Sequence, residues 1–244
     1  MRRSLRLTLL ALIAFAVIVL ARLPASWVFP NRPELSCASV DGTVWSGSCQ
    51  GLLVQRFALG DLAWDLAPLK LLTGALAAHV TLAHGPLAAR GDIARGFGGS
   101  VTLRNLTADV PLDPALIPHV PRQLRGSVHA QLSLARLEHG AIAELRGRIE
   151  AHDLTQRAGR VTALGSYAVT FSGGGGSAPV GTVEDLGGPL ALSGTLRLTR
   201  DPGYLLEGQV ATRPGAAPEL VNAVAFLGSP DALGRRPFSF GGTL

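Results

Sequence analysis

The chain is poor in aromatic and charged side chains. Of its 244 residues, 5% are aromatic and 16% are charged, and methionine occurs once. Lysine also occurs once, at Lys70, so the net charge of +5 comes from arginines that are spread along the sequence. Because these arginines neither cluster nor alternate with aromatic residues, the sequence predicts no nucleic-acid partner.

The sequence also lacks the common catalytic and metal-binding motifs. It contains no G-x-S-x-G, no H-E-x-x-H and no C-x-x-C. The six histidines are scattered, and His129 and His152 fall on polar strand faces, where we expect them to be solvated. Glu184 and Asp185 precede a Gly-Gly-Pro sequence, and we interpret them as part of a solvated turn. We therefore expect no enzyme activity, no metal and no cofactor.

The N-terminus carries a basic head, MRRSLR, followed by the unbroken apolar run LTLLALIAFAVIVLA at residues 7–21. A cleaved signal peptide and an uncleaved membrane anchor both have this shape. The small-residue cleavage site is missing, because Arg22 and Pro24 follow the run. We therefore interpret residues 1–28 as a cytoplasmic tip and transmembrane signal-anchor, and residues 29–244 as a β-rich periplasmic domain.

The flanking residues set the predicted orientation of this anchor. Arg2, Arg3 and Arg6 keep the N-terminus in the cytoplasm, since basic residues are retained on that side. Arg22 and Trp27 would then lie at the far membrane interface. The predicted location is the bacterial inner membrane, crossed once, with most of the chain in the periplasm.

Beyond the anchor the apolar residues recur with a period of two. Such alternation is typical of antiparallel strands that have one dry and one wet face. The clearest segments are residues 76–83, 127–134, 145–152, 161–171, 190–198 and 204–211. Asp201-Pro202-Gly203 has the composition of a tight turn and joins the last two segments as a hairpin.

Few helices are predicted to cover this sheet. One helical turn is expected after Pro68, another within residues 112–120, and one short C-terminal helix within residues 217–228. The fold class is therefore mainly β, with an N-terminal transmembrane helix and a long curved antiparallel sheet. This sheet must curl on itself, pair with a second sheet as a sandwich, or leave an open apolar trough.

The two cysteines lie in the predicted periplasmic part, where disulfides persist. Cys37 and Cys49 flank a predicted turn at Asp41–Gly42, so we expect a structural disulfide between them. A metal site would need further ligands that this segment lacks. We interpret Trp45, inside the loop, as an apolar plug of the first hairpin, with a binding role beside the membrane as the alternative.

Several segments in order resemble the type II secretion system protein N family (general secretory pathway protein N). The resemblance covers nearly the whole chain. It is carried by DGTVWSGSCQGLLV (41–54), LGDLAWDLAPLKLLTGAL (59–76), residues 85–112, ALGSYAVTF (163–171), VEDLGGPLALSGTLRL (183–198), DPGYLLEGQV (201–210) and FLGSPDALGRR (226–236). It implies structural roles for Gly42, Trp45, Gly47, Trp64, Pro68, Gly74, Gly187, Gly188, Pro189 and Tyr204.

The resemblance implies an inner-membrane accessory component of a machine that exports folded periplasmic proteins across the outer membrane. It implies no catalytic residues, and its expected partners are other inner-membrane and periplasmic secretion subunits. The one-faced strands also resemble AsmA-type and bridge-like lipid-transfer proteins, whose sheet forms a trough for acyl chains. A phospholipid partner in an apolar groove is therefore the alternative hypothesis.

Overall fold

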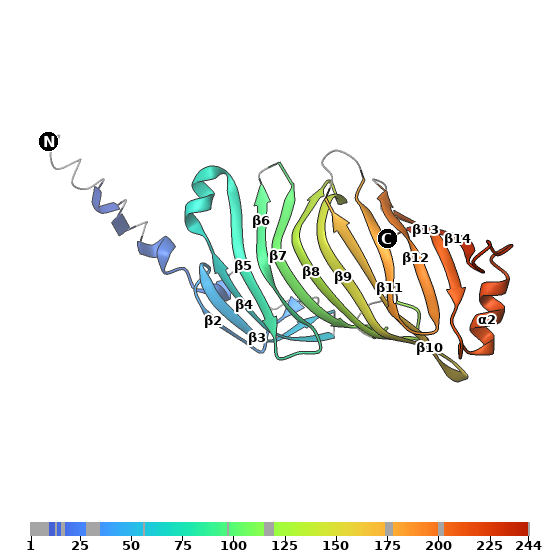
Figure 1. The fold of residues 1–244 in the computed structure, drawn as a ribbon. Coiled ribbons are helices and arrows are strands. Elements are labelled where there is room, and N and C mark those ends of the chain that lie inside the picture. Colours follow the sequence, from blue (N-terminus) through green and yellow to red (C-terminus); the bar gives the residue numbers. More distant parts are fainter. Residues whose placement is uncertain are drawn as a thin grey trace.

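The computed structural model describes residues 10–12, 14–15, 18–27, 35–55, 57–96, 98–114, 120–173, 178–199 and 203–243. Within them nearly all regular structure belongs to one 14-stranded antiparallel sheet (Figure 1). Its strands are β1 (Leu35–Ser36), β2 (Ser39–Gly42), β3 (Ser46–Val54), β4 (Phe57–Leu66), β5 (Ala75–Ala83), β6 (Ala88–Gly96), β7 (Val101–Pro111), β8 (Leu124–Glu138), β9 (Ala141–Ala158), β10 (Arg160–Ser172), β11 (Val180–Gly187), β12 (Leu190–Thr199), β13 (Gly203–Thr212) and β14 (Arg236–Thr243).

The strands follow the order of the sequence across the sheet. From β3 to β14 each strand pairs with the next, while β1 and β2 both pair with β3. All six segments with period-two alternation lie within strands, which confirms the β prediction. The hairpin of β12 and β13 is also confirmed, although Asp201 and Pro202 of its turn lie outside the described residues.

Helical structure is sparse, as the sequence predicts. The turn after Pro68 is the 3-10 helix η2 (Pro68–Thr73), and the C-terminal helix is α2 (Pro218–Ala225). A further 3-10 turn, η1 (Ala25–Trp27), precedes the sheet. The turn expected within residues 112–120 falls largely on residues 115–119, which lie outside the described part.

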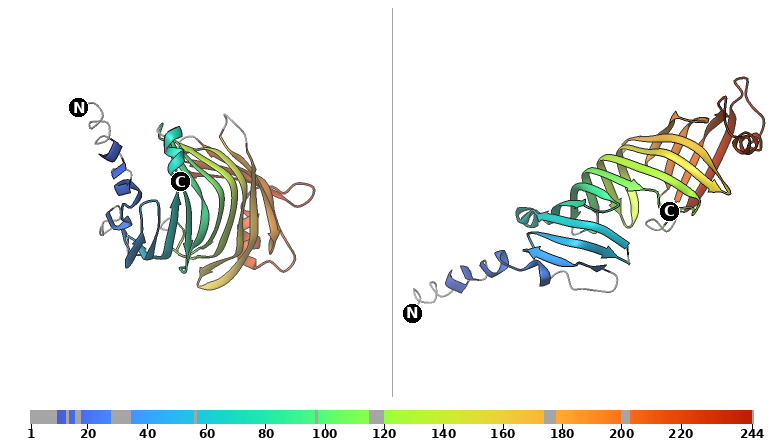
Figure 2. Two further views of the ribbon diagram at one scale, coloured as in Figure 1. Left: turned by 90° about the vertical axis from the view of Figure 1, so that its left-hand side faces the viewer. Right: turned by 90° about the horizontal axis from the view of Figure 1, so that it is seen from below.

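The sheet curls into an elongated open trough. Figure 2 shows the strands following one another around a curved cross-section. The N-terminal segment, whose continuous described part is residues 18–27, lies at one end and α2 at the other. No second sheet packs on this one in the described part of the chain. Of the arrangements that the sequence left open, the curled single sheet is therefore the one observed, and the sandwich is not.

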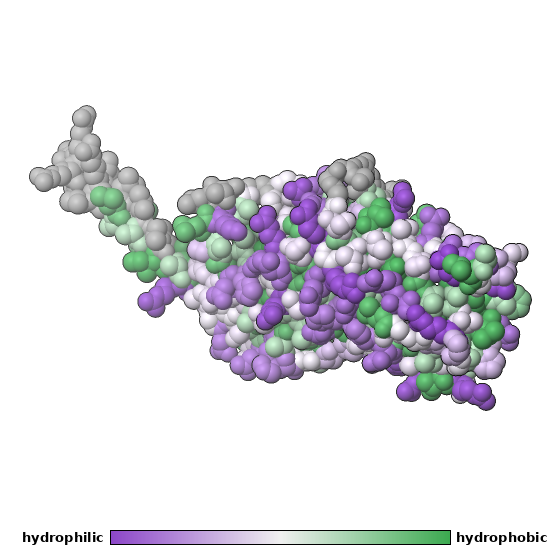
Figure 3. All heavy atoms as spheres, viewed as in Figure 1, coloured by the Kyte–Doolittle hydropathy of each residue, from purple (hydrophilic) through white to green (hydrophobic). Residues whose placement is uncertain are grey.

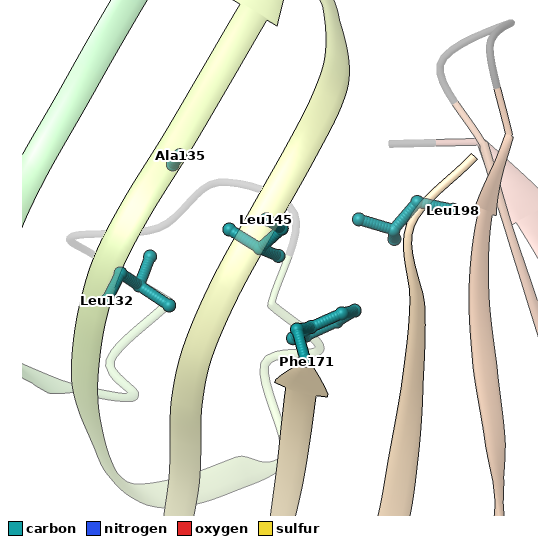
Figure 4. Packing of buried hydrophobic residues seen from close by; sticks show 5 residues of the cluster. All are labelled: Leu132, Ala135, Leu145, Phe171 and Leu198. Carbon is teal, nitrogen blue, oxygen red and sulfur yellow. The ribbon is translucent and has the colours of Figure 1, made fainter. Parts of the chain in front are cut away.

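Apolar side chains fill the concave side. Leu132, Leu145, Phe171 and Leu198 come from β8, β9, β10 and β12, yet they form one buried cluster and point toward one another (Figure 4). β8, β9 and β10 are consecutive strands, and β11, where the ring of Phe171 lies over Gly181, separates β10 from β12. Register extends this face, since Ala130, Ile149, Val169 and Val183 lie opposite one another on consecutive strands.

The convex side is polar. Figure 3 views this side, and hydrophilic side chains gather over the middle strands. They include Asp109, His129, Glu150 and Glu184, which belong to one row of the strand register. The apolar residues of the alternating pattern therefore face the inside of the trough, and the polar residues face the outside.

Aromatic rings on the concave face lie over glycines of the neighbouring strand. A Cβ atom added at these glycines would lie 2.6–3.0 Å from the ring, so only glycine leaves room for it. These aromatic–glycine pairs are Trp64 over Gly47, Phe171 over Gly181, Phe238 over Gly208 and Tyr204 over Gly242. Because glycine has no side chain, positions with a large ring alternate with positions that have no side chain. The sheet can therefore bend tightly.

β-Bulges add to the curvature. The strand register shifts in β6 between Arg90 and Asp92, and in β10 on both sides of Gly165. Such irregularities bend a strand and increase its twist. Gly165 has a φ of +104° and lies against the Gly187–Gly188 turn, so a side chain there would be strained and crowded.

Both ends of the trough have their own small core. At the N-terminal end Ala25, Cys49, Leu52 and Trp64 pack together. At the C-terminal end α2 packs Val224 against Val210 and Phe238 of the sheet. In the middle of the trough, Leu132, Leu145, Phe171 and Leu198 are buried against one another.

The predicted transmembrane helix falls on a partly described segment. Residues 10–12, 14–15 and 18–21 are helical. Among the residues that the structure describes, no helix reaches the length and apolar character that a membrane crossing requires.

Candidate functional site

The concave face contains an apolar groove between β3 and β7. Its cavity measures about 240 Å³ and is lined mainly by Leu52, Leu62, Val80, Leu82, Ile93 and Leu106. Almost all of the exposed lining is carbon. Ligand pockets are usually apolar clefts with a few polar groups for orientation, so this groove is suited to an apolar ligand or side chain.

Gly91 forms part of the groove floor. It lies in the β6 bulge, and a Cβ atom at this position would lie 3.1 Å from the Cα atom of Leu106 and 3.3 Å from its Cδ1 atom. The small residue therefore allows β6 and β7 to approach closely at the groove. No local pattern in the sequence indicates this role, because Gly91 is one of 30 glycines and only the register shows which face it occupies.

The N-terminal segment is fastened to the first hairpin close to this groove. The indole Nε1–H of Trp45 donates a hydrogen bond to the backbone oxygen of Leu20, at 2.7 Å. The backbone N–H of Val44 donates to the oxygen of Leu23, at 2.9 Å, and Pro24 forms a β-bridge with Thr43. Since the last carbonyls of a helix lack partners within it, Trp45 acts as a C-terminal cap.

This contact corrects the role expected for Trp45. Its side chain is half-exposed, whereas Trp64 is the tryptophan buried in the N-terminal core. The Nε1–H of Trp64 donates to the oxygen of Val44, at 3.1 Å, and its ring covers Gly47. The two tryptophans thus hold the same hairpin, Trp64 from within and Trp45 from the side of the N-terminal segment.

The predicted disulfide is present between Cys37 and Cys49, with Cα atoms 5.6 Å apart. Cys49 is fully buried beside Ala25 and Trp64. The bridge ties the chain before β2 to the middle of β3, and it therefore stabilises the hairpin to which the N-terminal segment is fastened.

The convex face carries a network of charged and polar side chains. Arg148 lies at its centre and contacts Glu150 and Glu184, each at 2.7 Å, and the hydroxyl of Thr170 at 3.1 Å. The hydrogen bond from Arg148, followed by that with His152, lowers the pKa of Glu150 below its ordinary value. The hydrogen bonds to the two carboxylates raise the pKa of Arg148.

Histidines on this face are paired with carboxylates, which refines the expectation that they are only solvated. His129 contacts Asp109, and His152 contacts Glu150 at 3.0 Å. His79 contacts Asp92 at 2.9 Å, and the hydrogen bonds from His79 and then Asn105 lower the pKa of Asp92. No three potential metal ligands converge in the described ranges. The His129–Asp109 and His79–Asp92 pairs join neighbouring strands across the outer face, whereas His152 and Glu150 both belong to β9.

Asp185 and Arg213 form a clamp that the sequence interpretation missed. Asp185 belongs to β11 and faces the concave side, whereas we expected it in a solvated turn with Glu184. Its Oδ1 atom lies 2.6 Å from Nη2 of Arg213, and its Oδ2 atom accepts from the N–H of Leu192 at 3.1 Å. Arg213 also donates to the oxygens of Gly188 and Leu190.

The clamp locks the turn between β11 and β12. Burial alone would raise the pKa of Asp185, but the hydrogen bonds from Arg213 and Leu192 outweigh it, so this pKa lies below its ordinary value. Gly187 and Gly188 have φ values of +118° and +121°, which favour glycine. Asp185 and Arg213 are 28 residues apart in sequence, so no local pattern could have linked them.

The remaining family-motif residues have structural positions. Gly42 is the last residue of β2 and has a φ of +92°, and Pro68 and Gly74 begin and cap η2. Pro189 follows the Gly187–Gly188 turn, and Tyr204 packs against the central core. Of the expected interface residues, Trp27 is 76% exposed and Arg22 follows the helical residues 18–21. Arg2, Arg3 and Arg6 lie outside the described residues.

The geometry defines a class: a single-sheet β-trough protein, apolar inside and polar outside, with an N-terminal segment fastened to one end. No solved structure matches the chain. The family described as "Type II secretion system (T2SS), protein N" matches residues 33–239, so the chain belongs to that family.

Two relatives support this assignment along the whole chain. The type II secretion system protein N of Aeromonas hydrophila is 26% identical over 257 aligned residues, covering 100% of both chains. That of Vibrio cholerae is 26% identical over 265 aligned residues, again covering both chains completely. The chain is therefore a component of type II secretion.

The cap made by Trp45 can be tested by the Trp45→Phe substitution. Loss of the indole donor leaves the carbonyl of Leu20 without this bond, which costs about 0.5–1.5 kcal/mol. We expect faster hydrogen exchange in residues 18–27, by up to roughly tenfold. Trp27→Phe, at an exposed side chain, serves as the control. Equal exchange in both variants would show that the cap does not hold the segment.

The Asp185 clamp predicts a pH-dependent stability. Because the pKa of Asp185 is lowered by folding, its contribution is complete above about pH 5 and is lost as the pH falls through the folded pKa. Asp185→Asn should cost about 1–3 kcal/mol at pH 7, measured by denaturant unfolding. The difference from the wild-type protein should shrink below about pH 4.

The control for this measurement is Asp41→Asn, at an exposed carboxylate in β2. The free energy of unfolding of this variant should match that of the wild-type protein within about 0.5 kcal/mol, both at pH 7 and below about pH 4. A difference for Asp185→Asn that does not change with pH would contradict the clamp as an ionic contact.

Proposed function

We propose that the chain is a non-enzymatic accessory scaffold of the type II secretion system, anchored in the inner membrane through residues 1–28. Its domain of residues 29–244 would extend into the periplasm and present its surfaces to other secretion subunits. Membership of the family supports the pathway. The attachment of the N-terminal segment supports the scaffold role, since Trp45 and Val44 fix where this segment leaves the trough.

The convex face supports docking rather than chemistry. Several of its charges are paired with one another, and Arg148 by itself joins β9 to β10 and β11. Arg146, which pairs with Glu144, and Arg197 also extend from the sheet. Such a rigid polar face is suited to reversible contacts with other polar protein surfaces, in which charge gives specificity.

Deletion of the gene in its host tests the scaffold role. We expect lower amounts of exported proteins in the medium and their retention in the periplasm, with recovery when the full chain is supplied again. A version whose residues 1–28 are replaced by a cleavable signal peptide should leave the membrane fraction and fail to restore secretion. Unchanged secretion after deletion would remove the basis for this proposal.

The apolar groove favours a second candidate, the binding of a phospholipid acyl chain. The groove is lined by carbon, opens on the concave face and lies at the end of the trough that carries the N-terminal segment. Burial of apolar surface contributes about 25 cal/mol per Å², so a groove of this kind stabilises a bound hydrocarbon chain. Scaffolding and lipid binding use opposite faces of the sheet and are compatible.

Adjacent alanines on opposite faces provide a matched test of lipid binding. Ala89 lines the groove, whereas Ala88 is exposed on the convex side. Protein extracted in mild detergent should carry phospholipid that mass spectrometry detects, and Ala89→Phe should reduce it while Ala88→Phe should not. Wild-type protein without lipid, or equal loss in both variants, would argue against this candidate.

A further inference from the structure

The two edges of the sheet differ in how they are protected. The N-terminal edge is divided between β1, of two residues, and β2, of four, and both lie beside the N-terminal segment. The C-terminal edge is β14, of eight residues, and no other strand in the described part of the chain pairs with its outer side. One edge is therefore short and broken, and the other is long and free.

Beyond its first two residues, β14 lacks the features that usually prevent strands from pairing edge to edge. Natural edge strands are protected by charges, prolines or bulges. After Arg236 and Pro237, the residues up to Thr243 carry no charge, and the register with β13 is regular. Ser239, Phe240, Gly241, Gly242 and Thr243 are all exposed. Helix α2 packs on β13 and on Phe238 of β14, and it leaves residues 239–243 of this edge exposed.

The apolar rows of the trough end abruptly at this edge. Phe240 lies opposite Leu206, which lies opposite Leu196, so it continues a row of the concave face. Its side chain is nevertheless 53% exposed because no strand follows. Phe238 and Phe240 share this face, with ring centroids 5.8 Å apart. A strand that covers the edge should therefore also be apolar on the concave side.

The aromatic–glycine pairs indicate which residue should face Phe238. In the middle of the sheet Phe171 has a glycine opposite it on each neighbouring strand, Gly147 and Gly181. Phe238 has one such neighbour, Gly208 on β13; its ring is buried against Val224 of α2, and no strand follows on its other side in the described part of the chain. A strand that offers glycine opposite Phe238 would reproduce the arrangement around Phe171.

The sequence of β14 itself supplies that glycine. When two β14 strands are placed antiparallel with Phe240 opposite Phe240, Phe238 of each copy falls opposite Gly242 of the other. This register keeps the concave faces of both sheets on one side, because Phe238, Phe240 and Gly242 alternate along the strand. The strand is thus complementary to itself in the pattern that the rest of the sheet uses.

We propose that two copies of the chain associate through antiparallel pairing of their β14 strands, with a twofold axis at Phe240. The two sheets then form one continuous sheet, and the apolar concave face runs from one copy into the other. The two N-terminal segments lie at the far ends of the joined trough. This association depends on the edge alone and does not rest on the proposed secretion or lipid-binding roles.

A cysteine substitution tests both the association and its register. The two native cysteines form a disulfide, so Phe240→Cys would introduce the one free thiol of the full chain. Directly opposed residues in antiparallel strands have Cβ atoms about 4.5–5.5 Å apart, whereas diagonal neighbours lie about 7–8 Å apart. Mild oxidation should therefore link Phe240→Cys into a covalent dimer.

Two controls accompany this experiment. Ser239→Cys places the thiols diagonally in the proposed register and should form little dimer. Val161→Cys, at an exposed position of β10, reports on random collisions. Dimer in all three variants would indicate collisions, and dimer from Ser239→Cys alone would indicate another register. Either result would overturn the proposed pairing.

Light scattering of the full chain in mild detergent gives an independent measurement. The wild-type protein should have the mass of a dimer, and Phe240→Lys should be a monomer with an unchanged circular dichroism spectrum, since the position is exposed. A wild-type monomer without cross-linking at residue 240 would overturn the proposal. Cross-linking of residue 240 only to a different polypeptide would also overturn the proposal.

Discussion

Curvature is the constraint on which the rest of this structure depends. One sheet with a dry face and no second layer can bury that face only by bending around it, so that side chains from distant strands meet. The cluster of Leu132, Phe171 and Leu198 lies on the inner face of the bent sheet, from β8 to β12. The glycines beneath the aromatic rings and the bulges of β6 and β10 permit the bend. The groove, the polar outer face and the clamped turn between β11 and β12 all depend on this curvature.

The sequence predicted the elements of the fold better than their arrangement. Strict alternation identified the strands, because each residue on a half-buried strand meets either solvent or apolar neighbours. The disulfide followed from two cysteines in a predicted oxidising compartment. Alternation has the same form in a sandwich and a trough, however, so only the structure distinguished them. The clamp of Asp185 with Arg213 depends on the course of three strands, and Trp45 binds a carbonyl 25 residues away.

Recognition of the family rested on the order of weak motifs rather than on a site. Residues such as Gly42, Trp64 and Gly188 maintain turns and packing. For a protein of this type the informative features are surfaces: the apolar hollow, the polar outer face and the free edge. The fastened N-terminal segment gives these surfaces a common orientation.

The order of the strands also bears on how the chain folds. From β3 onward every strand pairs with the one synthesised just before it, so each hairpin can close as soon as its second strand is available. Contacts close in sequence form faster than distant ones, because less chain must be ordered to make them. A chain that emerges from one end could therefore build its sheet strand by strand, starting at the disulfide-linked hairpin and ending at β14.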